Sequence, residues 1–165
     1  VTVAGEETYH RAFQALDSEV GDMLAPLTAI RDSLAVNARD QFATEGAAGG
    51  SPWAQLNAAY ETWKRQHYPQ ANQILVRTGA LEHLLTDPRQ ATIELTPQRL
   101  EWGVPDGIRN AEGGDISVYG AAHQSGSDRL PQRKIINLTD AELRGWDRII
   151  VRWIAELRRT VGLAA

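Results

Sequence analysis

Apolar residues recur every three or four positions along three stretches of the chain, and this spacing predicts three long helices. The first helix covers residues 6–20, the second roughly 25–44, and the third begins at about Thr139 and runs to Thr160. Pro26 lies in the first turn of the second helix, where a proline is tolerated. The apolar positions of the first two helices are Tyr9, Phe13, Leu16, Val20, Leu27, Ile30, Leu34, Ala38 and Phe42.

The C-terminal helix is the most sharply amphipathic of the three. Thr139 and Glu142 have the spacing of a capping box, in which each side chain bonds to a backbone amide of the first turn. At about 100° per residue, its apolar residues fall within about 140° of arc. They are Leu143, Trp146, Ile149, Ile150, Trp153, Ile154, Leu157 and Val161. The opposite face carries four arginines, which are Arg144, Arg148, Arg152 and Arg159.

Glycine and proline interrupt the helical pattern at residues 46–52. Three glycines and one proline in this segment predict a mobile surface loop, and we expect Trp53 to anchor that loop to the body of the protein. A short helix should follow before Tyr68, with Asn57 able to cap its start. This helix should end before Pro69, which disfavours helical geometry in the residue that precedes it.

Apolar and polar residues alternate over residues 91–104, which predicts a hairpin with a polar link at residues 96–99. Residues 107–114 are expected to form a loop. Residues 115–119 would then add another short strand to a small antiparallel sheet.

A shorter apolar run at residues 74–76 leads to Thr78 and Gly79. It fits a buried strand and the start of a helix equally well. Because glycine tolerates backbone angles that a Cβ forbids, we expect Thr78 and Gly79 to form a sharp turn between two packed elements.

Together these elements predict an α+β fold, in which a small antiparallel β-sheet packs against helices. A chain of 165 residues has the length of one ordinary domain. We therefore expect a single domain over residues 1–165, with an N-terminal helical arm at 1–24, a flexible glycine-rich loop at 46–52 and the long amphipathic C-terminal helix at 139–161.

Composition and charge exclude several classes of protein. No apolar run approaches the roughly 18 to 20 residues of a membrane span, so we expect a soluble protein without membrane contact. The absence of cysteine excludes disulfides, thiolate metal sites and a cysteine nucleophile. A net charge of −4 argues against wholesale wrapping of nucleic acid. The first five residues lack the features of a secretory signal, which predicts cytosolic synthesis.

No enzyme motif accompanies the residue types that carry catalysis. The chain has neither a phosphate-binding P-loop nor the serine elbow of a hydrolase. The chain has four histidines, at His10, His67, His83 and His123. None of them has the spacing of a metal site. We therefore expect no catalytic residue, no metal and no cofactor. A hydrolase or metal enzyme remains a hypothesis that metal analysis would test.

The arginine face of the C-terminal helix could meet an acidic partner or nucleic acid. Asp147 and Glu156 interleave with the arginines and partly neutralise them, which favours a solvated or protein-facing surface. The alternative function is a small nucleic-acid-binding protein that uses Arg144, Arg148 and Arg152. A salt-dependent shift of labelled DNA that is lost when Arg148 and Arg152 become Glu would support it.

Several short segments occur in an order typical of one protein family. They are residues 53–56, Lys64, residues 74–81, residues 119–126 and residues 130–133. This set resembles the phage virion morphogenesis family, of the tail-completion type found in Mu-like and related tailed phages, over roughly residues 25–155. Ser125 departs from the family, which commonly has a large residue there. Lys134 and Ile135 stand where the family often has a proline and an aromatic residue.

The resemblance implies a structural protein without catalysis, a tail completion or neck subunit at the head–tail connection or the top of the tail tube of the virion. We expect identical subunits to form a ring, a hexamer to match the usual symmetry of the tail. The expected partners are other copies of the chain and the neighbouring head-completion or stopper, tail terminator and tail tube proteins. DNA would pass through the ring without sequence-specific binding.

Nine residues are candidates for the assembly interface, namely Trp53, Arg77, His123, Gln124, Pro131, Arg133, Arg144, Arg148 and Arg152. We expect His123 and Gln124 to form a local hydrogen-bond pair that pins the loop after the hairpin. Pro131 would fix the entry to a segment in which Arg133 could form a multidentate salt bridge with a neighbour.

Overall fold

A computed structural model describes residues 6–68 and 73–162. Within these residues the chain is mostly helical, with one two-stranded antiparallel sheet packed against helices, which confirms the predicted α+β class. The elements in order are α1 (Glu6–Val20), α2 (Leu24–Ala43), the 3-10 turn η1 (Ala47–Gly49), α3 (Ala58–His67), α4 (Ala80–Thr86), β1 (Thr92–Thr96), β2 (Arg99–Trp102), α5 (Ile116–Ser125) and α6 (Asp140–Thr160).

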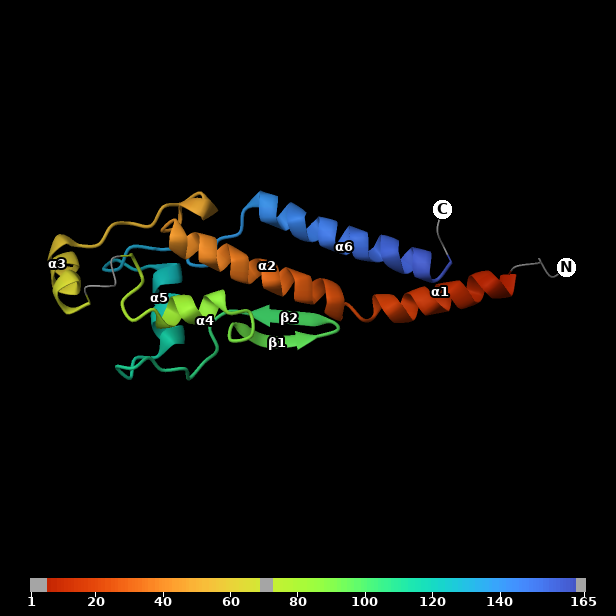
Figure 1. Ribbon diagram of the computed structural model, residues 1–165, viewed down its shortest axis with the longest axis horizontal. Coiled ribbons are helices and arrows are strands. Elements are labelled where there is room, and N and C mark those ends of the chain that lie inside the picture. The colour runs from red at the N-terminus through yellow and green to blue at the C-terminus, as the bar shows by residue number, and fades with distance from the viewer. Residues whose placement is uncertain (1–5, 69–72, 163–165) are drawn as a thin grey trace.

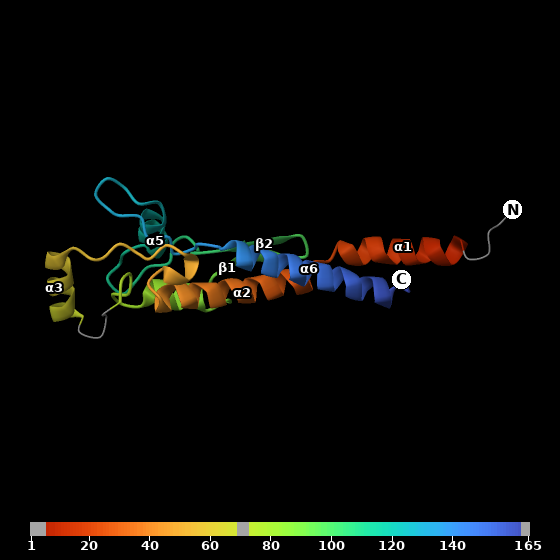
Figure 2. The same ribbon diagram turned by 90° about the horizontal axis from the view of Figure 1, so that it is seen from above.

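The protein is elongated, with α2 at its centre (Figures 1 and 2). Helices α3, α4 and α5 gather at one end, and the hairpin β1–β2 lies beside α2 (Figure 1). At the other end, α1 and the C-terminal part of α6 extend away from this body as a two-helix arm (Figures 1 and 2). The three long helices and the hairpin therefore lie where the sequence pattern predicted them.

Helix α2 supplies the apolar face around which the body packs. Its predicted stripe includes Ile30, Leu34, Ala38 and Phe42, and all four side chains are buried. Ala38 and Phe42 continue into a core cluster with residues of α4, α5 and the connecting segments. The other members of that cluster are Trp53, Ile74, Leu81, Leu84, Leu85, Ala91, Ile116 and Ile135.

The hairpin fixes the joint between α1 and α2. Its strands pair with Leu95 opposite Leu100, and the link predicted at residues 96–99 forms the turn. At this turn the Pro97 carbonyl accepts a hydrogen bond from the Met23 amide at 2.9 Å. The Gln98 side chain donates to the carbonyl of Gly21 at 2.8 Å. The linker from which the arm extends is thus held by the hairpin.

Helix α6 starts with the capping box that the sequence predicted. The Glu142 amide donates to the Thr139 hydroxyl at 3.3 Å, and the Glu142 carboxylate accepts from the Thr139 amide at 2.6 Å. Two side chains attach this helix to α2: the Trp146 indole donates to the Ser33 hydroxyl at 2.8 Å, and the Asn37 amide donates to Glu142.

The prediction of a strand at residues 115–119 is wrong, because this segment forms the N-cap and the first turn of α5. Asp115 caps the helix, and its carboxylate accepts from the Ser117 amide at 3.0 Å and the Ser117 hydroxyl at 2.8 Å. Gly120 is buried where the helix packs on α4, and a Cβ there would lie 3.5 Å from Leu81, in ordinary van der Waals contact. Capping and packing against α4 therefore outweigh the short apolar alternation in this segment.

The apolar run at residues 74–76 is neither a strand nor a helix. It belongs to an irregular turn in which Leu75 has a φ of 63°, and α4 starts only after Gly79. Gly79 has a φ of 78°, in agreement with the sharp turn predicted for Thr78 and Gly79. Ile74 is buried in the core and anchors this turn.

Trp53 closes the glycine-rich segment onto the body, as predicted. Its side chain is only 3% exposed, and its indole donates to the Lys134 carbonyl at 2.9 Å. Its ring meets Phe42 edge-on at 5.4 Å between ring centroids. The segment itself forms η1, and Asn137 donates to the Gly49 carbonyl at 2.6 Å. The mobility expected for residues 46–52 stays a prediction.

Two glycines of this segment provide a matched test of the packing around Trp53. Gly46 and Gly50 both have positive φ, of 87° and 76°. A Cβ at Gly46 would lie 2.5 Å from Trp53, whereas a Cβ at Gly50 meets nothing within 4 Å. We expect Gly50→Ala to cost about 1–2 kcal/mol in the free energy of unfolding through backbone strain alone. Gly46→Ala should cost about 1–3 kcal/mol more through overpacking.

Urea unfolding of both variants measures this difference. Equal losses in the two variants would contradict the assigned close contact between Gly46 and the Trp53 ring.

Candidate functional site

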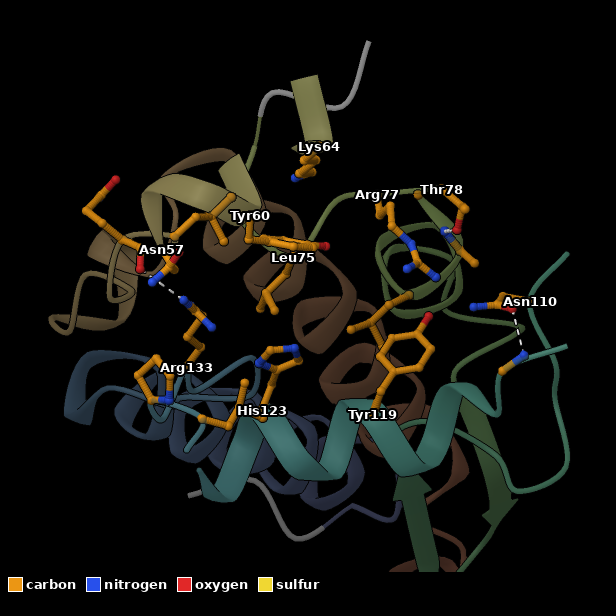
Figure 3. A pocket seen from close by; sticks show the side chains of 18 of the residues that line it. Asn57, Tyr60, Lys64, Leu75, Arg77, Thr78, Asn110, Tyr119, His123 and Arg133 are labelled. Carbon is orange, nitrogen blue, oxygen red and sulfur yellow. Dashed lines mark hydrogen bonds between the residues drawn. The ribbon is translucent and has the colours of Figure 1, made fainter. Parts of the chain in front are cut away.

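A pocket of about 720 Å³ lies at the body end of the protein, between α3, the turn before α4, α5 and the segment after α5 (Figure 3). Helix α3 contributes Tyr60 and Lys64, and α5 contributes Tyr119 and His123. The remaining described residues that line it are Gln55, Leu56, Asn57, Leu75, Arg77, Thr78, Gly79, Ala80, Leu81, Asn110, Gly114, Arg129, Leu130, Pro131 and Arg133.

The nine predicted interface residues separate into three groups. Arg77, His123, Pro131 and Arg133 line the pocket. Trp53 and Gln124 do not line it but hydrogen-bond to the segment that follows Arg133, and the three arginines of α6 do not line it either. These three are Arg144, Arg148 and Arg152.

Arg133 is a buried cation held by its own chain. Its side chain is almost fully buried, with 5% of the residue exposed. Its Nε donates to the Ala54 carbonyl at 2.9 Å, and its terminal nitrogen donates to the Gln55 carbonyl at 3.2 Å. Burial lowers the pKa of the guanidinium below its ordinary value, but an arginine stays charged in proteins. The salt bridge to a neighbour that we considered for Arg133 stays a prediction.

Lys64 is a second buried cation on the opposite side of the pocket (Figure 3). It is 3% exposed, and its ammonium donates to the Gln73 carbonyl at 2.5 Å. Burial lowers the pKa of Lys64, and the negative charge of Glu45 partly opposes this shift. Within the described residues neither Lys64 nor Arg133 forms an ion pair.

His123 projects from α5 into the pocket (Figure 3). It is half-buried, and its Nδ1 has no hydrogen-bond partner among residues 6–68 and 73–162. Burial lowers the pKa of the imidazole, and the charge of Arg133 lowers it further. The neutral imidazole is therefore the form that the folded protein favours.

Gln124 pins the segment after α5, whereas the expected pair with His123, which was to pin the loop after the hairpin, does not form among the described residues. Its carbonyl oxygen accepts from the amides of Ile135 and Ile136 at 2.8 and 3.0 Å, and its amide donates to the Ile136 carbonyl at 2.8 Å. The His123 side chain takes no part, but its backbone carbonyl accepts from the Arg133 amide at 2.8 Å. One wall of the pocket is thus fixed by α5.

Arg77 is the only pocket cation among the described residues with a carboxylate partner. It pairs with Glu112, which also accepts a hydrogen bond from the Tyr68 hydroxyl. The guanidinium lies 5.7 Å from the centre of the Tyr68 ring. These contacts tie the turn before α4 to the loop at residues 110–114.

The lining is strongly cationic. It contains Lys64, Arg77, Arg129 and Arg133, and none of its described residues is acidic. The whole chain, by contrast, has a net charge of −4. The pocket therefore concentrates positive charge at one end of an acidic protein.

Helix α6 forms a second candidate surface. None of its residues is buried, although it carries the apolar stripe defined above. Leu143 and Ile154 are 43% and 38% exposed, and they form the open edge of the stripe. The other stripe residues, Trp146, Ile149, Ile150, Trp153, Leu157 and Val161, are partly covered. The three candidate arginines are exposed on the polar face, with Asp147 and Glu156 exposed between and beside them.

The model of the phage virion morphogenesis family matches residues 6–154, which is most of the chain. The chain belongs to the phage virion morphogenesis family. No significant match was found among curated proteins or among solved structures.

This family consists of structural virion morphogenesis proteins and not of enzymes, so the chain is a structural protein of a phage virion. Among residues 6–68 and 73–162, no helix has both the length and the apolar character needed to cross a membrane. In the same part of the chain, no cluster of three histidine or acidic side chains is arranged to hold a metal ion.

The segments that carried the family resemblance meet around the pocket. Lys64, the turn after residue 74, Tyr119, His123 and the segment at residues 130–133 are far apart in sequence but adjacent in the fold. Lys64 and Tyr119 belonged to the resemblance but were not selected as site residues. No sequence signal marked Tyr60 or Arg129, because the surrounding fold alone brings them to the pocket.

The burial of His123 makes a pH-dependent prediction. The unfolded state, with a pKa near 6.5, binds a proton more tightly than the folded state does. The resulting loss of stability should therefore begin as pH falls below about 6.5 and be complete below the folded pKa. We expect His123→Gln to lose less stability than the parent protein between about pH 7.5 and about pH 5.

Urea unfolding at the two pH values measures the effect, with His83→Gln as the matched loss of one exposed imidazole. If His123→Gln keeps the full pH dependence of the parent protein, the assigned burial of His123 is wrong.

Proposed function

We propose that the chain is the tail completion subunit of a tailed phage, which forms a homo-oligomeric ring at the head–tail connection or the top of the tail tube. Membership of a virion morphogenesis family supports a role in the particle. The single observation that supports self-association is the apolar stripe of α6. In one subunit none of its residues is buried, and Leu143 and Ile154 are exposed.

An exposed stripe of this kind favours association. Apolar surface removed from water contributes about 25 cal/mol per Å², and contiguous exposed apolar patches commonly mark interaction sites. Leu143 and Ile154 are eleven positions apart, so the open edge spans about 16 Å of helix. A second copy of the chain that covers this edge would bury several large side chains at once.

A ring requires one patch of each subunit to meet a different patch on the next, since heterologous contacts generate cyclic assemblies. In the proposed ring, the two-helix arm of one subunit contacts the body of its neighbour. Six subunits would match the usual symmetry of the tail. The arm and the segment at residues 46–52 are the parts proposed to change conformation on assembly.

The two faces of α6 have different roles in this proposal. The apolar stripe contacts the neighbouring subunit, and the arginine face remains for solvent, a neighbouring neck protein or the passing DNA. Arg144, Arg148 and Arg152 are exposed, and the acidic residues beside them lower the net charge of the face. This arrangement favours weak, sequence-independent contacts with DNA at most.

A matched pair of substitutions on α6 tests the apolar contact. Ile154 belongs to the stripe, whereas Ala155 lies off it and is exposed. We expect Ile154→Glu to weaken self-association by about ten- to a hundredfold per contact, because a buried isoleucine contributes about 1.5–3 kcal/mol. Ala155→Glu introduces the same charge about 100° around the helix from Ile154 and should leave association unchanged.

Light scattering of the purified proteins and complementation of a phage that lacks the gene measure the two effects. Equal losses in both variants would rule out the stripe as the contact. Mature particles should contain the protein in their neck or tail, and its absence from them would refute the proposed function itself.

A further inference from the structure

The strongest unexplained feature of the protein is the concentration of unpaired positive charge in the pocket. Lys64 and Arg133 are both buried, and within the described residues they bond only to backbone carbonyls. Burying a charge is costly unless an opposite charge compensates it. The negative charge of Glu45 partly offsets Lys64, but within residues 6–68 and 73–162 no carboxylate forms an ion pair with either cation.

Both cations keep unused hydrogen-bond donors. An ammonium has three N–H donors, of which Lys64 uses one on Gln73. A guanidinium has five, of which Arg133 uses two on the carbonyls of Ala54 and Gln55. Arg129 adds a further cationic side chain at the exposed rim. These groups can donate hydrogen bonds to a carboxylate without giving up the bonds that hold the pocket walls.

The rest of the pocket lining provides apolar and aromatic surface in addition to the positive charges. Leu75, Leu130 and Pro131 supply apolar surface, and Tyr60 and Tyr119 supply aromatic surface with hydroxyl groups. A cavity of about 720 Å³ has the size of a pocket for a small ligand or a few peptide residues. This combination fits an acidic side chain next to an apolar one.

We propose that this pocket binds a short acidic peptide segment of another virion protein, with a carboxylate facing Lys64, Arg129 and Arg133 and a neighbouring apolar side chain against Leu75 and Leu130. Nucleic acid fits less well, because duplex DNA needs an exposed basic surface whereas Lys64 and Arg133 are buried. The net charge of −4 also opposes the approach of a polyanion.

Two acidic groups of the chain that act on pocket cations are already engaged. Glu112 binds Arg77 and Tyr68, and Glu45 accepts a hydrogen bond from the Ile74 amide at 2.7 Å. Helix α6, the proposed contact between copies, extends toward the opposite end of the protein (Figure 1). The inference that the partner is a different protein therefore rests on the proposed ring. The inference that the pocket binds an acidic peptide does not depend on the ring.

Titration of the full chain with the peptide acetyl-Leu-Glu-Leu-Glu-amide tests the site, by calorimetry and by the nuclear magnetic resonance signal of the His123 ring. The matched peptide acetyl-Leu-Gln-Leu-Gln-amide removes only the charges. We expect the acidic peptide to bind about tenfold or more tightly than the amide peptide, and to weaken as salt increases. It should also shift the His123 signal.

Two arginine variants locate the binding. Arg129→Gln should weaken binding of the acidic peptide by about three- to tenfold, since it removes one exposed cation from the rim. Arg148→Gln makes the same change on the polar face of α6 and should leave binding unchanged.

Several results would overturn the proposal. They are equal binding of the two peptides, no binding of either, equal losses in the two variants, and tighter binding of hexathymidylate than of the acidic peptide. A shift of the His123 signal when the protein alone is concentrated would assign the pocket to a second copy of the chain and overturn the choice of partner. The measurement does not require a ring, so its failure is distinguishable from failure of the proposed function.

Discussion

The architecture of the body depends on the burial of Trp53. Its indole bonds to the Lys134 carbonyl, its ring packs on the edge of Phe42, and its amide donates to the Glu45 carbonyl at 2.7 Å. This one residue thus joins the end of α2, the glycine-rich segment and the segment after α5. Because residues 54 and 55 follow directly, their carbonyls are held where Arg133 can bond to them. The cationic pocket is a consequence of this anchor.

Regular periodicity made much of the fold predictable from the sequence. The periodicities that predicted α1, α2 and α6, the capping box at Thr139 and the alternation in the hairpin are local patterns, and the structure has the predicted element at each of these places. The strand expected at residues 115–119 failed because the cap formed by Asp115 and the packing of Gly120 against Leu81 outweigh four or five alternating residues. The turn at Leu75 likewise depends on tertiary contacts that periodicity does not record.

The pocket could be predicted only in part. Arg77, His123, Pro131 and Arg133 were candidates because they lie in the family's motifs, but nothing in their spacing indicated that they share one cavity. Arg133 is buried by contacts with a segment roughly seventy to eighty positions away. Lys64 is buried against the turn at residues 73–76, which the sequence left ambiguous. Local sequence rules cannot supply such contacts, since they arise only once the core has formed.

The body is stabilised by contacts within one subunit, whereas the apolar face of α6 is not fully covered by its own subunit. The pocket walls are held by hydrogen bonds within the chain, whereas α6 buries none of its residues despite its apolar stripe. A photo-crosslinking residue placed at position 154 in assembled particles tests the meaning of that difference most directly. The account predicts a crosslink to a second copy of this chain. A crosslink only to a different virion protein, or none between chains, would contradict it.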